Sequence, residues 1–591
     1  MRRLHFFFIK LNTFILDRLK HIVILFVLIN ATITKAQQIV SIDETIFLHA
    51  NATTFVSGET LLYKIHCLKS TDKTPSTISK IAYVELIDEA KKIVFKNKIN
   101  LESSTGQAEY FIPTTVKTGK YKLIAYTQWM LNKLDSSFFE TNITIINPYI
   151  SDEKQNSNVI INTDPDKFIK NIKSTNSNII PPNNIKLILN KNKFKNREIV
   201  SLNFKSDDNT ITEGSFSLSV RKIEDLPFEN QISAVDFSFK QENNFVDLQN
   251  SKTKIYLPEL RGEKLSGKLI AKNNTDKVEN KTIAFSLPGK NFIFKIIRTD
   301  NTGSFQININ QVDSNSEITI QLMDEDVNNY YIKLDEEAII DYTKLLITEN
   351  YKLPPNFKEI LINRSINSQI ENAYYASKTD KIIIPKENPT FFHPLAKKYI
   401  LDDYTRFNTL KETIKEVTTE VYYKQIDNKS FLHVNDPNVF PQQPDLPLVL
   451  IDGLYLENQN ELFEYNMKNV FKIEIITGRY FLGSKFFNGL ISFTTFNNAF
   501  KSSQSGSSII KSTIQRPQPK KTYYKVNYSD LNINKRIPDF RNQLIWNPEV
   551  DLRNINTFYT SDVSGTFEIK LEGFAKNGTP VSLIETFEVN E

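Results

Sequence analysis

Short runs of β-branched and aromatic residues, separated by turn residues, recur along this chain and limit what it can fold into. Examples are 61–65 (LLYKI), 81–87 (IAYVELI) and 121–126 (YKLIAY), with glycine or proline between them. Such residues favour strands, and short strands at regular spacing without a long helical period are typical of a β-sandwich. We therefore predict a mainly β protein of tandem sandwiches, the first over residues 37–148.

The length of 591 residues leaves room for several such domains. At roughly 150 residues per domain, about four are expected. The hydrophobic fraction of 40% and the charged fraction of 24% are ordinary for a soluble globular chain. The net charge of +5 is too small to indicate nucleic acid or an anionic membrane as a partner.

Residues 1–36 match a secretory signal peptide. Basic residues precede the apolar run 21–33 (HIVILFVLINATI), and Thr34 and Ala36 place small residues before a cleavage position. The run of 13 residues is shorter than the roughly 20 that a spanning helix needs. We expect cleavage, an exported protein that is periplasmic or associated with the outer membrane, and no transmembrane span in the mature chain.

The remaining chain divides by composition. Residues 149–184 are polar and rich in Asn, Asp, Ser and Lys, which predicts a linker. Strand-like runs resume over 185–339, as one large sandwich or two small ones. A break near Pro258 favours two, over 185–255 and 256–339.

Helical periodicity replaces the strand pattern over 340–435, which we predict to be a helical connector. Ile362 and Ile366 recur at helical spacing, and Thr409 with Glu412 matches a capping box that begins a second helix. The apolar stripes of both helices are expected to pack on neighbouring domains.

Strand, helix and strand patterns alternate over 436–499. Residues 448–451 (LVLI) are predicted to form a strand that is buried on both faces. The Ser-, Lys- and Pro-rich residues 500–520 are predicted to be a linker, and 521–591 to form a C-terminal sandwich.

No catalytic, cofactor-binding or metal-binding residues are predicted, and no cofactor. The chain lacks the motifs of serine hydrolases, zinc proteases, P-loops and dinucleotide-binding folds. Its single cysteine, Cys67, cannot form an internal disulfide, and His66 beside it on a strand points to the opposite face. Asp452 ends a predicted strand, where α/β enzymes often place a carboxylate, but Gly453 follows and we interpret it as a turn residue.

Residues 58–132 resemble the macroglobulin-type sandwich of bacterial alpha-2-macroglobulin-like proteins. The similar segments are GETLLYK at 58–64, AYVELID at 82–88 and GKYKLIAYT at 119–127. The covalent trap of that family needs a Cys-Gly-Glu-Gln thioester, whereas Cys67 is followed by Leu-Lys-Ser. The resemblance therefore implies the fold and not covalent protease trapping.

Two further segments resemble known modules. Through LPELRG at 257–262, SGKLI at 266–270 and TDNTGSF at 299–305, residues 256–322 are similar to a carboxypeptidase-regulatory-like sandwich, which the resemblance implies is non-catalytic. Residues 446–495 resemble the plug domain of outer-membrane TonB-dependent receptors, through PLVLIDG at 447–453 and GLISFTT at 489–495. A receptor barrel needs several hundred residues, and about 95 follow here, so the resemblance implies a barrel-less, plug-like domain. The domain order resembles a group of envelope proteins from Bacteroidota.

These patterns predict a non-enzymatic interaction or scaffold protein that docks to an outer-membrane protein, such as a β-barrel or a TonB-linked complex. Tyr480, Phe481, Phe486 and Phe487 are candidate anchors, although they could instead pack within the plug-like module. Two alternatives stay open. One is a thioester-independent protease inhibitor of the macroglobulin type, with an exposed bait loop in one of the two linkers. The other is an envelope hydrolase with two acidic side chains within about 10 Å of each other.

Overall fold

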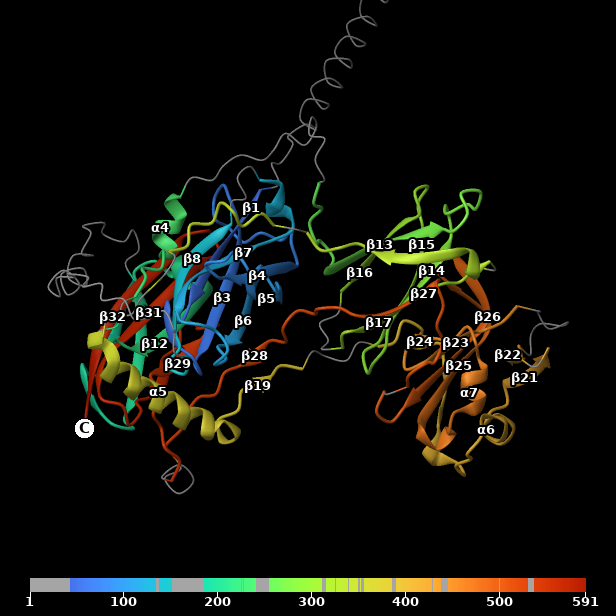
Figure 1. Ribbon diagram of the computed structural model, residues 1–591. Helices are drawn as coiled ribbons and strands as arrows, with labels where there is room; N and C mark the ends of the chain where they lie inside the picture. The colour runs from blue at the N-terminus through green and yellow to red at the C-terminus, as the bar shows by residue number, and fades with distance from the viewer. Residues whose placement is uncertain are drawn as a thin grey trace, which may run out of the picture. The chain divides into compact units, whose positions relative to one another are not determined.

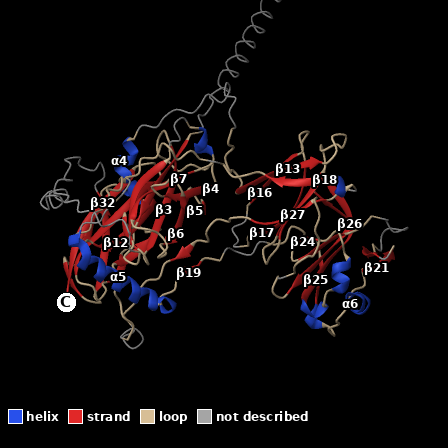
Figure 2. Cartoon of the chain, viewed as in Figure 1, coloured by secondary structure: helices blue, strands red, loops and turns tan. Residues whose placement is uncertain are grey.

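The structure is a computed structural model that describes residues 43–133, 138–150, 185–224, 226, 228–240, 255–310, 315–324, 326–338, 340–348, 351, 355–384, 389–427, 429–436, 445–498, 500–529 and 536–591 (Figure 1). The predicted signal peptide and most of the predicted linker 149–184 lie outside these residues. Strands dominate the described part (Figure 2), which confirms the predicted mainly β fold class.

The first sandwich consists of two sheets with a shared apolar core. The three-stranded sheet has the order β1-β3-β6, and the five-stranded sheet has the order β2-β8-β7-β4-β5. Ile65, Leu86 and Leu123 are fully buried in this core, and Leu86 and Leu123 lie opposite each other on one face of the larger sheet. The strands are β1 (Glu44–Ala50), β2 (Thr54–Val56), β3 (Thr60–Lys69), β4 (Ile81–Ile87), β5 (Ile93–Asn100), β6 (Thr105–Phe111), β7 (Gly119–Tyr126) and β8 (Phe139–Ile146).

The second sandwich joins two segments that are far apart in the sequence. Its larger sheet has the order β10-β32-β31-β12-β29, and its smaller sheet has the order β30-β11-β9. Leu218 of β12 pairs with Leu571 of β31, so green and red strands of Figure 1 share one sheet. The strands are β9 (Ile185–Leu189), β10 (Lys193–Lys195), β11 (Ile199–Ser206), β12 (Gly214–Lys222), β29 (Gln543–Asn547), β30 (Asn556–Tyr559), β31 (Gly565–Ala575) and β32 (Pro580–Asn590).

This pairing differs from the separate sandwiches expected over 185–255 and 521–591. Each segment contributes four strands, and both sheets contain strands from both segments. Apolar alternation along a strand shows which face is buried, but it does not show which strand lies alongside. The long-range partner was therefore not visible in the local pattern.

The third sandwich also receives a distant strand. Its sheets have the orders β16-β13-β18 and β15-β14-β17-β27. Strand β27 comes from the predicted linker 500–520, and Ile510, opposite Ile320 of β17, packs against the core. The strands are β13 (Glu263–Ala271), β14 (Thr282–Leu287), β15 (Ile293–Arg298), β16 (Ser304–Ile309), β17 (Glu317–Leu322), β18 (Tyr330–Leu334) and β27 (Ile509–Thr513).

A small α/β module follows in the chain. Its sheet has the order β20-β25-β26-β23-β24, beside a β21-β22 hairpin and two short helices. All four residues of β23 are buried, as predicted, and the capping box of Thr409 and Glu412 is present at the start of α6. The elements are β20 (Lys397–Ile400), α6 (Leu410–Val417), β21 (Val421–Ile426), β22 (Lys429–Val434), β23 (Leu448–Ile451), β24 (Leu454–Tyr455), α7 (Asn460–Glu464), β25 (Val470–Leu482) and β26 (Lys485–Thr495).

Helix α5 (Lys358–Ala373) turns a different face inward from the one predicted. Ile362 and Ile366 are 48% and 47% exposed, whereas Leu361 and Arg364 are buried. The expectation that this stripe packs on a neighbouring domain was wrong, because buried ion pairs of Arg364 fix the rotation of the helix. The predicted connector 340–435 also contains strands β20, β21 and β22.

Short elements complete the described part. No helix in it is long and apolar enough to cross a membrane. The helices α3 (Asn209–Thr212) and α4 (Ala234–Phe239) and the paired strands β19 (Lys381–Ile382) and β28 (Lys521–Thr522) are the remaining elements. Single 3-10 turns lie at Trp129–Asn132, Val327–Asn329, Pro355–Phe357, Tyr375–Ser377, Leu401–Asp403 and Met467–Asn469.

Candidate interaction surface

The long hairpin of β25 and β26 carries all four predicted aromatic anchors at its tip. In its register Tyr480 lies opposite Phe487, and Phe481 lies opposite Phe486. Residues opposite each other in an antiparallel pair share a face of the sheet, and successive residues point to opposite faces. The hairpin therefore separates the four rings into an inner pair and an outer pair.

The inner pair has a structural role. Phe487 is 8% exposed, and both it and Tyr480 pack in a cluster that includes Phe294 and Ile296 of the third sandwich. The alternative was packing within the plug-like module alone, but these two rings pack against the third sandwich as well as against the module.

Polar contacts hold the turn of the hairpin against the third sandwich. Arg298 Nη2 donates to the carbonyl of Ser484 at 3.3 Å, and Lys485 Nζ donates to the carbonyl of Met323 at 2.7 Å. At Gly483, where φ is +59°, a Cβ atom would lie 3.0 Å from the carbonyl oxygen of Ile296. These contacts hold the inner side of the hairpin tip against the third sandwich, which supports the outer side rigidly.

The outer pair is exposed. Phe481 is 70% and Phe486 is 49% exposed, and their ring centroids lie 6.2 Å apart. The guanidinium of Arg479 lies over the Phe486 ring, 5.6 Å from its centroid. We call Arg479, Phe481 and Phe486 the outer hairpin face.

This combination of side chains is typical of binding sites for proteins. Aromatic residues and Arg are enriched at protein interfaces and among the residues that dominate binding energy. Sequence reasoning found the two exposed rings but did not separate them from the buried ones, and it missed Arg479. The two-residue turn between Leu482 and Lys485 sets the register of the hairpin. That register shows which rings share a face, and it places Arg479 on the face of Phe481.

Asp452 is a structural turn residue, as we interpreted it from the sequence. It adopts the left-handed region with φ +50° and is 2% exposed. Its carboxylate accepts hydrogen bonds from the backbone N–H and the hydroxyl of Thr495, each at 2.7 Å, and from the N–H of Phe500 at 3.2 Å. All of these contacts tie β23 to the end of β26 and to the segment that follows it.

Cys67 lies in the core of the first sandwich. Its thiol donates to Oε2 of Glu44 at 3.5 Å, and burial, with Glu44 nearby, raises its pKa well above the usual value. His66 points to the opposite face, where its ring lies 5.8 Å from that of Phe574. In the described ranges no three His, Cys, Asp or Glu side chains are placed to hold a metal ion.

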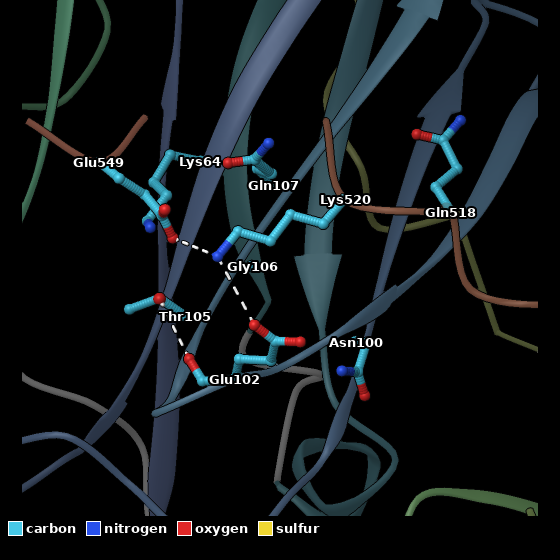
Figure 3. A pocket seen from close by; sticks show the side chains of 9 residues that line it. All are labelled: Lys64, Asn100, Glu102, Thr105, Gly106, Gln107, Gln518, Lys520 and Glu549. Atoms are coloured by element: carbon cyan, nitrogen blue, oxygen red, sulfur yellow. Dashed lines mark hydrogen bonds and ion pairs between the residues drawn. The ribbon is translucent and has the colours of Figure 1, made fainter. Parts of the chain in front are cut away.

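A polar cavity lies where the first sandwich meets the segments around Lys520 and Glu549 (Figure 3). Lys520 Nζ lies between Oε1 of Glu549 at 2.6 Å and Oε2 of Glu102 at 3.5 Å. Burial lowers the pKa of the neighbouring Lys64 to about 8. The cavity volume of about 20 Å³ is room for one or two water molecules, so this pair of carboxylates does not form a cleft for a glycan or peptide.

Most of the segment 500–520 is not an exposed bait loop, and only residues 501–507, before the strand, are largely exposed. Strand β27 occupies its middle, and beyond it Gln518 N–H donates to the carbonyl of Lys98 at 2.9 Å. The side chain of Gln518 exchanges hydrogen bonds with the backbone of Glu109. The other candidate for such a loop, 149–184, lies outside the described residues except at 149 and 150.

No protein-family model matches the sequence, and no curated protein is similar to it. Among solved structures, an alpha-2-macroglobulin from Salmonella reacted with methylamine is 9% identical over 93% of this chain and 23% of that chain, with a TM-score of 0.15. The alpha-2-macroglobulin of Escherichia coli activated by porcine elastase is 7% identical over 93% of this chain and 53% of that chain, also with a TM-score of 0.15. A beta-glucosidase from Listeria innocua is 11% identical over 17% of this chain and 16% of that chain, with a TM-score of 0.12. The chain spans 23% and 53% of the length of the two macroglobulins, and TM-scores this low carry no argument about function.

Proposed function

We propose that the protein is a non-enzymatic interaction protein of the bacterial envelope that binds a partner protein through the outer hairpin face. The observation that carries this proposal is the exposure of Phe481 and Phe486 side by side, with Arg479 over one of the rings. The envelope location rests on the signal peptide expected at residues 1–36. As the partner we propose an outer-membrane protein, such as a β-barrel or a TonB-linked complex.

The inner side of the hairpin supports this role through its rigidity. Tyr480 and Phe487 are packed, and the turn is bonded to the third sandwich. A partner that covers the outer rings therefore meets a hairpin whose tip is already held in place, which lowers the entropy cost of binding. Truncating a well-packed aromatic anchor of this kind typically costs about 2 kcal/mol or more of binding free energy.

Site-specific photo-crosslinking in the native envelope tests the proposal. A benzophenone analogue of phenylalanine replaces Phe481 in one strain and Phe239 in another. Phe239 is a matched control because it is a phenylalanine with 68% exposure on a different element, α4. We expect a discrete adduct with an outer-membrane protein from position 481 and not from position 239. No adduct at 481, or the same adducts at both positions, would remove the basis of the proposal.

A further inference from the structure

The outer hairpin face carries charge as well as apolar surface. Arg479 makes its cation–π contact with Phe486, and no carboxylate of the described residues pairs with it. A second arginine, Arg298, reaches the turn of the same hairpin through the carbonyl of Ser484, and it too has no carboxylate partner in the described part. The nearby Lys485 differs, because it turns inward to Met323 and lies 4.0 Å from Asp324.

The stacked position of Arg479 favours one kind of ligand. A guanidinium that lies over an aromatic ring keeps N–H groups at its edge, and these suit the two oxygens of a carboxylate. Phe481 and Phe486 beside it offer apolar area to the side chains that flank such a carboxylate. Positive charge that has no carboxylate partner among the described residues is complementary to negative charge on the ligand.

We infer that the outer hairpin face recognises an acidic segment of its partner, with an Asp or Glu side chain on Arg479 and an adjacent apolar side chain on the two phenylalanine rings. This inference rests on the proposed function and names the chemistry of the partner. Phe481 and Phe486 lie on one face of the β25-β26 hairpin, and packing on its opposite face holds the tip in place.

The same geometry disfavours a lipid surface as the ligand. Inserting Phe486 into hydrocarbon would carry the guanidinium of Arg479 with it. A charged side chain costs several kcal/mol at the centre of a bilayer. At a protein interface, by contrast, an Arg over an aromatic ring is a common arrangement.

Selection from a random peptide library tests the inference with a defined probe. The full chain is immobilised, phage-displayed twelve-residue peptides are selected on it, and binders that also bind the double variant Phe481→Ala/Phe486→Ala are discarded. We expect the remaining peptides to carry Asp or Glu next to an aromatic or aliphatic residue. Because both rings are exposed, the double variant should keep the thermal unfolding midpoint of the wild type.

Point variants then test the role of the charge. Arg479→Gln should raise the Kd of the selected peptides about tenfold or more, since a charge-assisted hydrogen bond is lost. Arg261→Gln changes an exposed arginine outside the hairpin and should leave the Kd within about twofold. Higher salt should weaken binding to the wild type more than binding to Arg479→Gln.

The outcomes separate the two proposals. The inference of an acidic partner would be overturned if the ring-dependent peptides lack acidic residues, or if their Kd is the same for wild type and Arg479→Gln. The proposal that the hairpin binds a protein would survive either result. If no peptide depends on the rings, both proposals fail. Sedimentation with phosphatidylglycerol vesicles that is lost in the double variant would instead identify a lipid surface as the ligand and overturn the inference.

Discussion

The guanidinium of Arg364 in α5 forms a bidentate ion pair with the carboxylate of Glu59 in the first sandwich. Nε lies 2.7 Å from Oε1, and Nη2 lies 2.8 Å from Oε2. Nη1 of the same guanidinium donates at 3.0 Å to the carboxylate of Glu224, which follows the end of β12. Arg221 of β12 also lies 3.0 Å from the carboxylate of Glu59. One buried side chain of the helix is therefore bonded to both sandwiches.

Replacing Arg364 by Met should strongly destabilise the protein. The variant leaves Glu59 and Glu224 buried with one fewer cation, and breaking a buried pair in this way typically costs about 3–5 kcal/mol. Urea unfolding measures the loss. Arg553→Met is the control, because its pair with Asp551 is largely exposed and should contribute less than about 1 kcal/mol.

The same pair predicts a pH dependence of stability. Burial alone would raise the pKa of Glu59, but Arg364 and Arg221 outweigh burial and lower the pKa from 4.5 to about 2. A carboxylate with a depressed pKa in the folded state stabilises the protein above pH 4.5, and this contribution is lost as the pH falls towards 2. The full contribution is about 3 kcal/mol. The stability difference between wild type and Arg364→Met should therefore shrink between about pH 6 and about pH 3, and an unchanged difference would contradict this account.

Glu259 should show the opposite pH dependence. Burial raises its pKa from 4.5 to about 7, despite hydrogen bonds from the Lys264 N–H and the Tyr83 hydroxyl. A raised pKa means that ionisation in the folded state carries a penalty, which grows as the pH rises from 4.5 and is complete above about 7. Glu259→Gln should thus gain stability relative to wild type between about pH 5 and pH 8, by up to about 3 kcal/mol. Chemical unfolding of both proteins at several pH values measures the gain. A Glu259→Gln variant whose stability falls relative to wild type as the pH rises would disprove the raised pKa of Glu259.

The pairing of β12 with β31 can be tested through Leu218 and Leu571. Each is fully buried, and replacing either by Ala should cost about 2–5 kcal/mol. Because the two residues are cross-strand neighbours, the double variant should cost less than the sum of the singles by at least about 0.5 kcal/mol. Leu218→Ala combined with Leu86→Ala, in the core of the first sandwich, should be additive within about 0.5 kcal/mol.

The strand within the segment 500–520 should resist trypsin in the folded protein. Lys511 lies in β27, opposite Thr319 of β17, so trypsin can cleave after it only when the strand has unfolded locally. Arg553 is exposed and serves as the reference site in the same chain. Mass spectrometry of the early fragments should show cleavage after Arg553 before cleavage after Lys511. Early cleavage after Lys511 would restore the bait-loop alternative.

Local signals in the sequence predicted local structure well. The apolar run of β23 and the capping box at Thr409 both appear where expected, because each depends on residues only a few positions apart. The exposed stripe of Ile362 and Ile366 was mispredicted, since helical spacing alone does not show that a buried arginine turns the helix.

Long-range relationships were out of reach. The strands of the second sandwich find their partners across more than 300 residues, and β27 was hidden in a polar composition. At the candidate site the sequence identified the aromatic cluster. Which of the four rings are buried could not be predicted, because burial of Tyr480 and Phe487 depends on contacts with the third sandwich.

The split of the second sandwich also determines when it can form during biosynthesis. Strand β12 ends at Lys222, and its neighbours β29 and β31 begin at Gln543 and Gly565. A ribosome adding roughly 5–20 residues per second needs tens of seconds to deliver those neighbours. Throughout that interval β12 has neither of its partners and must be kept from pairing with other chains. A newly made chain therefore depends on chaperoning, or on delayed folding, until its last strands arrive.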